Sequence, residues 1–526
     1  MMKKAHVLLP ILAMALVTVT ACDHGNGPDS TPLPDSSTTL PDSSTGSLWP
    51  EGYVENSGVG GTNYKQVDSK EMSVSLKQEL EGEGTRCLDS LGEQRILVIP
   101  VEFTDFPAAD LTGGADAAKE RIQKAFFGSA EDTGWESLTS YYTKSSYGKL
   151  QLTGRVTDWF NLGISVESLL NEVWPSQPNA SYGNSTWYIL REAVKWYKAN
   201  WKAKGWEDIK YYDQDHDGFL DAVWLVNSAA IKAYQSDDFW AFTYWDYLQS
   251  PNVDDPVAMC YASASINFLS KAQYPGNKPD AHTMIHETGH VLGLPDYYTY
   301  DTGDWGAAGG GDMMDQNVGD HNSFSKTLYG WTNPYVVEGD AEITIRPFES
   351  TGDCIIVKNG WNGHGFDEYL ILEYYTPTGL NKSDSDSAYC GTYVQLPRKS
   401  GVKIYHIDAR LGDFAFDPSK GYVFQNYTDV ISESSNITTQ MAHSNTRSRT
   451  VNNNKLIHLL EASGRNSFKD NGGQITNLSL FTKGTGIGLK AFNGFKFNDG
   501  TTLDYVIQIT DINENGATIV FNAKQN

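Results

Sequence analysis

Apolar runs along the first half of the chain predict strands of a buried sheet. The longest run, RILVIPVEF at Arg95–Phe103, is continuous, as in strands that are covered on both faces. Further strands are expected at Leu150–Val156 and, with the sequence AVWLVNSA, at Ala222–Ala229. The segments between these three runs have a different, helical spacing of apolar residues.

In those segments apolar positions recur every three to four residues, which predicts helices. The longest candidate is STWYILREAVKWYKANWKAK, in which Ser185 looks like the N-cap. Its apolar positions fall on one face, and we interpret them as core packing rather than as a binding box. These positions are Trp187, Leu190, Val194 and Tyr197. Shorter helices are expected near Ala115–Phe127 and around Glu136–Lys144.

The pattern changes beyond Pro334, where short alternating runs are separated by Gly, Asn and Asp turns. Examples are AEITIRPF, EYLILEYY, VKIYHID and ATIVFNA. This alternation predicts a β-rich C-terminal region over residues 337–526, built as a sandwich or as two small sheets. Together with the helices and strands of residues 94–336, it places the chain in the α+β class.

The first residues have the form of an export signal. MMKKAHVLLPILAMALVTVTAC has a positive start, an apolar run and small residues ahead of Cys22. Its end, VTAC, resembles the bacterial lipobox, in which lipid is attached to the cysteine after cleavage. We expect residues 1–21 to be a lipoprotein signal peptide and lipid on Cys22 to anchor the protein to a membrane. The alternative is ordinary secretion, with Cys22 removed or incidental.

Polar segments follow the signal. Residues 22–50 contain LPDSST twice within a run rich in Pro, Ser, Thr and Asp, so we expect a disordered tether that holds the folded part away from the membrane. Residues 51–93 are polar and turn-rich and form an N-terminal extension or a propeptide. These features indicate an exported bacterial lipoprotein of the cell envelope, surface-anchored or extracellular.

The net charge bears on which partners the protein can bind, and the cysteines bear on disulfides. The net charge of −25 argues against a nucleic-acid partner, because a phosphate-binding surface needs clustered Lys and Arg. Besides Cys22 there are four cysteines, which an exported protein can pair in disulfides. Cys354 and Cys390 form a plausible local pair. Cys87 has three open roles: a metal ligand, a disulfide partner of Cys260, or a plain thiol.

The segment HETGHVLGLPD carries the strongest chemical pattern in the chain. On a helix, His286 and His290 lie one turn apart and project from the same face, as two ligands of a tetrahedral zinc ion do. Gly293 tolerates the conformation that ends a helix, so the chain can turn and return Asp296 as the third ligand. Two histidines and one carboxylate leave a position for water, which is typical of a catalytic site.

Glu287 completes this arrangement as the general base. It lies beside the first histidine and can reach water on the metal without ligating the metal itself. Zinc lowers the pKa of that water, and Glu287 can take its proton and pass it to the departing amine. Peptide-bond hydrolysis is the simplest outcome. The alternatives are an exposed helix with two ordinary histidines and a degenerate, metal-free relative.

With these residues the sequence resembles the immune inhibitor A family of bacterial secreted zinc metalloproteases. HETGHVLGLPDYY is similar to the zinc motif of that family, and weaker similarities extend over residues 94–415. The resemblance implies a metzincin-like catalytic domain over residues 94–336, with a twisted sheet, a backing helix and an active-site helix. Asp296 stands where most metzincins carry a third histidine, and Gln316 stands where some carry a tyrosine ligand.

Further candidate residues follow the zinc motif. GGGDMMDQNVGDHNSFSK looks like the methionine turn of metzincins, and Met314 is the expected floor beneath the zinc. A methionine in a turn is otherwise more often plain packing. His321 follows that turn and is a candidate contact for the substrate oxyanion, with a structural role as the alternative.

A second metal is predicted at DQDHDGFLD. Its alternating aspartates and its glycine resemble an EF-hand calcium loop, although Trp224 replaces the usual glutamate and a strand follows in place of a helix. We therefore expect an isolated loop that binds a structural Ca²⁺. The expected ligands are Asp213, Asp215, Asp217, the carbonyl of Phe219, and Asp221. An acidic surface turn without a metal is the alternative.

These patterns together predict a surface-anchored zinc endopeptidase that cleaves extracellular proteins or peptides, with a catalytic Zn²⁺ and a structural Ca²⁺. The second hypothesis is a non-catalytic, calcium-stabilised surface adhesin that binds through its β-rich region. The glutamate of HETGH weighs against the adhesin, because a binding module has no need of a general base.

Overall fold

The computed structural model describes residues 61–69, 87–181, 183–270, 278–432, 434, 436–450, 452, 454–489, 492 and 494–524. The expectations for the signal peptide, Cys22 and the tether lie outside these residues. Helices make up 25% of the chain and strands 28%, which confirms the α+β class. Among the described residues, no helix is long and apolar enough to cross a membrane.

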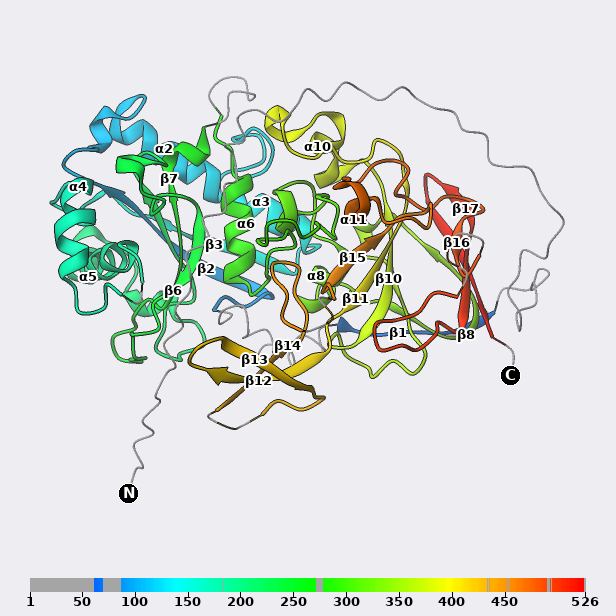
Figure 1. Cartoon of the computed structure of the whole chain (residues 1–526). Helices are drawn as coiled ribbons and strands as arrows, with labels where there is room; N and C mark the ends of the chain where they lie inside the picture. Colours follow the sequence, from blue (N-terminus) through cyan, green and yellow to red (C-terminus); the bar gives the residue numbers. More distant parts are fainter. Residues whose placement is uncertain are drawn as a thin grey trace.

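The first half of the chain builds a six-stranded sheet (Figure 1). Its strands are β2 (Gly92–Glu102), β3 (Leu150–Val156), β4 (Phe160–Asn161), β5 (Val223–Asn227), β6 (Phe242–Trp245) and β7 (Cys260–Ser265). Their order is β3-β2-β5-β7-β6, with β4 also paired to β2. All neighbours are parallel except β6, which runs antiparallel to β7 at the edge. The three strands predicted from apolar runs are confirmed as β2, β3 and β5.

Helices cover both faces of this sheet, because the side chains of β2 alternate between two cores. Ile96 and Val98 point into one core, and Leu97 and Ile99 into the other. The first core receives α2 (Gly114–Phe127), α3 (Leu138–Ser145) and α6 (His282–Val291), and the second receives α5 (Thr186–Lys204). The apolar stripe predicted on α5 is buried in the second core, which confirms its packing role.

Ser185 precedes α5 as predicted, but it does not cap the helix with its side chain. Its Oγ donates instead to Asp238 Oδ2 over 2.6 Å. The residue before it, Asn184, supplies the side-chain acceptor, since its Oδ1 accepts from Thr186 N at 3.0 Å. Ser185 is therefore the N-cap residue by position, as predicted, but its hydroxyl group bonds to a tertiary partner instead of a helix amide.

The C-terminal region is β-rich as predicted. Most of its strands join one nine-stranded sheet. Eight strands follow the order β15-β11-β10-β9-β8-β18-β17-β16, and the ninth, β1, pairs with β8. The bounds are β1 (Thr62–Gln66), β8 (Tyr335–Ile345), β9 (Cys354–Val357), β10 (Glu368–Tyr375), β11 (Gly401–Asp408), β15 (Ile457–Leu460), β16 (Gly486–Ile487), β17 (Tyr505–Asn513) and β18 (Gly516–Ala523). Side chains from both ends of this sheet share one core, so it curls on itself instead of forming two sheets packed face to face as a sandwich does.

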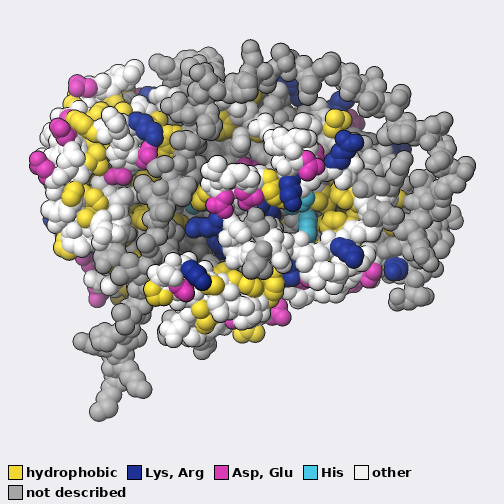
Figure 2. Space-filling model, in the orientation of Figure 1, with side chains coloured by type: hydrophobic (Ala, Val, Ile, Leu, Met, Phe, Trp, Pro, Cys, Tyr) yellow, Lys and Arg dark blue, Asp and Glu magenta, His cyan; other side chains and the backbone are white. Residues whose placement is uncertain are grey.

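A separate three-stranded sheet, of order β13-β12-β14, lies beside the end of α6 (Figure 1). Its strands are β12 (Leu411–Asp417), β13 (Gly421–Tyr427) and β14 (Ile437–Met441). Hydrophobic side chains gather on the visible face of this small sheet (Figure 2). In β13, Tyr427 is exposed, and Tyr422, Val423 and Phe424 are half-buried.

One described segment of the N-terminal extension, strand β1, belongs to the second sheet, because it pairs antiparallel with β8. Short helices complete the fold: α4 (Val166–Ser168), α7 (Met313–Gln316), α8 (Ser323–Leu328), α9 (Phe348–Thr351), α10 (Lys382–Asp386) and α11 (Ser467–Asn471). The first core continues from the six-stranded sheet into the C-terminal region, since Met314 and Tyr141 share it with Ile356 and Tyr405. The predicted boundary at residue 336 therefore separates two sheets that are joined by one core.

Candidate metal centre

Helix α6 places His286 and His290 on one face, with their ring centroids 4.9 Å apart and their planes perpendicular. His286 Nδ1 lies 2.8 Å from the carbonyl oxygen of Met313, and His290 Nδ1 lies 2.7 Å from that of Leu294. A carbonyl oxygen only accepts, so each Nδ1 carries the hydrogen and donates it. In a neutral ring the Nε2 of each histidine then keeps its lone pair, as a metal ligand requires.

The loop after α6 brings Asp296 back to these rings. Gly293 adopts a φ of 101°, and its amide donates to His290 O at 2.9 Å, which ends the helix as predicted. Asp296 Oδ1 then lies 3.0 Å from His286 Nε2 and 3.3 Å from His290 Nε2. One ligand atom from each of these residues falls within 4.8 Å of the other two, so the three predicted zinc ligands are brought together.

A positive charge between these three side chains would stabilise the arrangement. Two Nε2 lone pairs face a buried carboxylate oxygen, and Asp296 Oδ1 has no hydrogen-bond partner among the described residues. Burial opposes ionisation of Asp296, but the two imidazoles outweigh it and hold its pKa far below the usual range. Burial alone would lower the pKa of His290, but the charge of Asp296 raises it to about 9. Two imidazoles and one carboxylate are also a donor set that suits zinc.

Glu287 lies beside the three ligands and outside the cluster that they form. Its side chain is buried, and the Thr243 hydroxyl on strand β6 lies 3.2 Å from its Oε2 and 2.8 Å from its backbone oxygen. Burial raises the pKa of Glu287 above its ordinary value, although the nearby histidines oppose the rise. A carboxylate in this environment is a stronger base than one in water.

Met314 lies directly beneath α6, as expected for the floor of the site. A Cβ atom built on Gly289 would lie 2.5 Å from the sulfur of Met314, so the glycine of HETGH makes room for the methionine. Asp312 caps α7 by accepting from the Met314 amide at 2.8 Å. That cap fixes the turn whose Met313 carbonyl orients His286, so the methionine turn also positions a ligand.

His321 is fully buried, with 1% of its surface exposed. Four aromatic rings lie around it, those of Tyr141, Tyr142, Tyr329 and Trp331. Neither ring nitrogen has a hydrogen-bond partner among the described residues, and burial lowers the pKa of His321 well below its usual range. An oxyanion donor must face the substrate, so this enclosure argues against the predicted contact and for the structural alternative.

The acidic loop before β5 brings Asp213, Asp215 and Asp221 together, with one carboxylate oxygen from each within 4.8 Å of the others. Burial, backed by the charges of its neighbours, raises the pKa of Asp221 to about 7. Mutual repulsion of this kind is what a bound cation relieves, and oxygen ligands suit calcium. Asp217 is outside this group, and its Oδ1 accepts from the Phe219 amide at 2.8 Å. The ligand role of the Phe219 carbonyl stays a prediction.

The contacts of the cysteines differ from the disulfides that the sequence predicts. The side chain of Cys87 hydrogen-bonds to Cys260 and to Trp245, which argues against a role as zinc ligand. No disulfide joins Cys87 to Cys260 in the described part of the chain, so the plain thiol is the role that the structure favours. Cys354 is buried in β9 and hydrogen-bonds to threonine side chains. No disulfide joins Cys354 to Cys390 in the described part of the chain, so their predicted pairing is not present.

Several groups that shape the site have no signature in the sequence. They include Thr243, the carbonyl groups of Leu294 and Met313, and Tyr300, whose hydroxyl donates to Asp296 Oδ2. The one local signal is the run YYTY at residues 297–300, directly after Asp296. The carbonyl groups cannot be found by motif, because every residue has one.

Neither models of protein families nor curated proteins give a match to this chain. The resemblance to the immune inhibitor A family therefore stays a prediction that rests on the motifs. What can be said about function comes from the side chains around α6.

Proposed function

We propose that the protein is a zinc-dependent endopeptidase that hydrolyses extracellular proteins or peptides. The observation that carries this proposal is the convergence of His286, His290 and Asp296, with Glu287 buried beside them. Zinc, when bound, supplies a Lewis acid that polarises a peptide carbonyl and lowers the pKa of water. A structural zinc site would have no use for the glutamate.

In this proposal each side chain has a distinct task. His286 and His290 hold the metal through Nε2, because their Nδ1 atoms are occupied by backbone carbonyls. Asp296 offers Oδ1 as the third ligand. Glu287 takes a proton from the attacking water and returns it to the nitrogen of the departing amine. The Thr243 hydroxyl, 3.2 Å from the Glu287 carboxylate, keeps that carboxylate directed at the site.

The wider assignment follows from the same motifs. We propose membership of the immune inhibitor A family, with a metzincin-like catalytic domain in which Met314 forms the floor beneath the zinc. Export as a lipoprotein through Cys22 and a structural Ca²⁺ at the acidic loop are parts of this proposal. The packing of Met314 against Gly289 supports it, because a methionine below the zinc helix is the arrangement that the resemblance implies.

The test is Glu287→Ala in the full chain, with Glu342→Ala, an exposed glutamate on β8, as the matched control. We expect Glu287→Ala to lower the rate of casein or gelatin cleavage by about 10²–10⁴-fold, the usual contribution of a general base. Zinc content should stay near one per chain in both variants, because neither residue is a ligand. Chelation of the metal should abolish cleavage by the wild type.

Full activity in Glu287→Ala would rule the mechanism out. A folded wild type that binds no zinc and shows no chelator-sensitive cleavage would favour the other candidate, a calcium-stabilised surface adhesin. Hydrophobic side chains lie at the surface of the small sheet β12–β14 (Figure 2), and an adhesin would use this surface to bind its ligand.

A further inference from the structure

The carboxylate of Asp296 uses its two oxygens differently. Oδ1 faces the two imidazole Nε2 atoms, and Oδ2 accepts a hydrogen bond from the hydroxyl of Tyr300. A carboxylate with one oxygen bound in this way cannot rotate freely. Tyr300 therefore determines which oxygen Asp296 presents to the metal proposed above.

The backbone around Tyr300 is held by the C-terminal region. Tyr300 N donates to Thr446 O at 2.8 Å, and the side chain of Asn445 donates to Tyr297 O at 3.0 Å. Asn445 and Thr446 are each 1% exposed. These bonds bracket the loop just after Asp296, although the partners are almost 150 residues away in the sequence.

Both side-chain N–H groups of Asn445 have partners, and its side-chain oxygen accepts a hydrogen bond. Its Oδ1 accepts from Ile457 N at 3.0 Å, and its Nδ2 donates to Ile457 O at 2.9 Å, so the amide pairs with strand β15 as a second backbone would. The remaining Nδ2 hydrogen goes to Tyr297 O. Only an amide side chain of this length supplies one acceptor and two donors in these directions.

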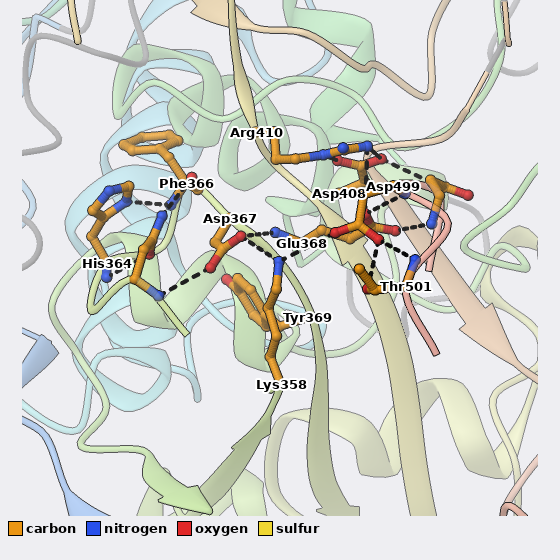
Figure 3. A network of polar contacts seen from close by, with 12 residues as sticks. Lys358, His364, Phe366, Asp367, Glu368, Tyr369, Asp408, Arg410, Asp499 and Thr501 are labelled. Carbon is orange, nitrogen blue, oxygen red and sulfur yellow. Dashed lines mark hydrogen bonds and ion pairs between the residues drawn. The ribbon is translucent and has the colours of Figure 1, made fainter. Parts of the chain in front are cut away.

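Residues 443–446 begin beside a polar network of the nine-stranded sheet, of which Figure 3 shows Asp408, Arg410 and Glu368. Asp408 binds Arg410 through both carboxylate oxygens, at 2.7 Å each, and Asn498 adds a bond of 2.9 Å. His443 Nε2 lies 3.2 Å from the same carboxylate. Glu368 accepts from His406 at 2.8 Å on the neighbouring strands. The network ties residues 443–446 to the nine-stranded sheet.

We propose that Tyr300 and Asn445 are positioning residues of the metal centre, and that the C-terminal region sets metal affinity by holding the loop that carries Asp296. This inference rests on the proposed function. Tyr300 acts on the ligand directly, and Asn445 acts through the backbone of Tyr297. Partners of ligating carboxylates commonly contribute about 10- to 100-fold to metal affinity.

The experiment measures the dissociation constant of Zn²⁺ by competition with a chromogenic chelator, using the full chain. The variants are Tyr300→Phe and Asn445→Ala. Tyr374→Phe and Asn359→Ala are matched controls, because Tyr374 donates to Asn513 O at 2.9 Å and the Asn359 amide bridges Thr502 O and Asp504 N, all in the C-terminal region. Thermal unfolding of the metal-free variants shows whether the fold is intact.

We expect Tyr300→Phe and Asn445→Ala to weaken zinc binding by about 10- to 100-fold. Both controls should bind as the wild type does. A purely structural role would lower the melting temperature without changing the affinity of the folded protein. Unchanged affinity in both variants would overturn the inference while leaving the proposed function standing, and weakening in Tyr300→Phe alone would overturn the part given to Asn445. A wild type that binds no zinc would overturn both proposals.

Discussion

At the candidate metal centre, single hydrogen bonds determine which atom each side chain can offer to a metal ion. The convergence of His286, His290 and Asp296 could be predicted because it depends on local geometry: one helical turn, a helix end and a short return. Thr243 and Asn445 could not be predicted, because their contacts join residues that are 44 and 148 positions away from them. Such contacts are set by how the sheets pack, which no short motif encodes.

A substitution of His321 distinguishes a structural role of this residue from a contact with the substrate oxyanion. We expect His321→Phe to keep the rate of casein cleavage within about threefold of the wild type, whereas loss of an oxyanion donor costs roughly 10²–10³-fold. The phenyl ring fits among the aromatic neighbours and removes two buried nitrogens that have no hydrogen-bond partner among the described residues. The free energy of unfolding should therefore rise by about 1 kcal/mol. Initial rates and urea unfolding measure both, and a hundredfold slower enzyme would restore the oxyanion role.

At the scale of helices and strands, the spacing of apolar residues predicted whether a segment is a helix or a strand. It predicted the first and last residues of these elements less well. Strand β3 begins and ends at the predicted residues, Leu150 and Val156, whereas β5 is shorter than its apolar run. Ser185 is the N-cap residue of α5 as predicted, but its hydroxyl bonds to Asp238 and makes no capping bond to the helix. Local preference predicts an element, but its ends depend on neighbours that the local sequence does not specify.

The acidic loop before β5 should depend on calcium for stability. We expect added Ca²⁺ to raise the melting temperature of the wild type but not that of Asp213→Asn, because that change removes one of the three clustered carboxylates. Calcium at 100 times its dissociation constant would add about 2.7 kcal/mol. Differential scanning calorimetry provides the measurement. Asp254→Asn, an exposed aspartate nearby, should respond as the wild type does. An equal response of Asp213→Asn would count against the site.

Strand β15 carries a histidine that should make the fold sensitive to acid. Burial, followed by the charges of His406 and Lys469, lowers the pKa of His458 to about 3. The unfolded chain binds this proton near pH 6.5, so the stability from keeping His458 neutral is present above that pH and is lost as the pH falls towards 3. In His458→Gln the urea midpoint of the metal-free protein should fall less steeply between these values. An unchanged slope would contradict this assignment.

At the scale of the whole molecule, the fold class and the change of character near residue 336 could be predicted, but the way the parts join could not. Strand β1 of the N-terminal extension pairs with β8, and one core runs from Leu88 to Leu480. Polar contacts cross the same boundary: Glu373 accepts from the Ser323 amide at 2.7 Å, and Asp384 accepts from the Gly319 amide at 2.7 Å. Contacts between distant segments leave no periodic pattern in either one.

This shared core predicts that the residues up to Asn333 cannot fold alone. In a chain that ends at Asn333, the core would lose its C-terminal members, such as Ile356 and Tyr405, and the Ser323 and Gly319 amides would lose their carboxylates. Each large side chain left exposed costs about 1.5–3 kcal/mol and each unpaired buried amide about 1–3 kcal/mol, so several such losses are comparable with the usual net stability of a domain, about 5–15 kcal/mol.

We therefore expect the truncated protein to unfold without a cooperative transition and to bind zinc far more weakly than the full chain. Calorimetry and near-ultraviolet circular dichroism measure the packing, and chelator competition measures the metal. A cooperative transition with wild-type zinc affinity would show that residues up to 333 form an independent domain, and it would also contradict the role given to Asn445. Weak zinc binding by a cooperatively folded truncation would instead isolate the contribution of the C-terminal region to the metal centre, since in that case only the loop that carries Asp296 would have lost its support.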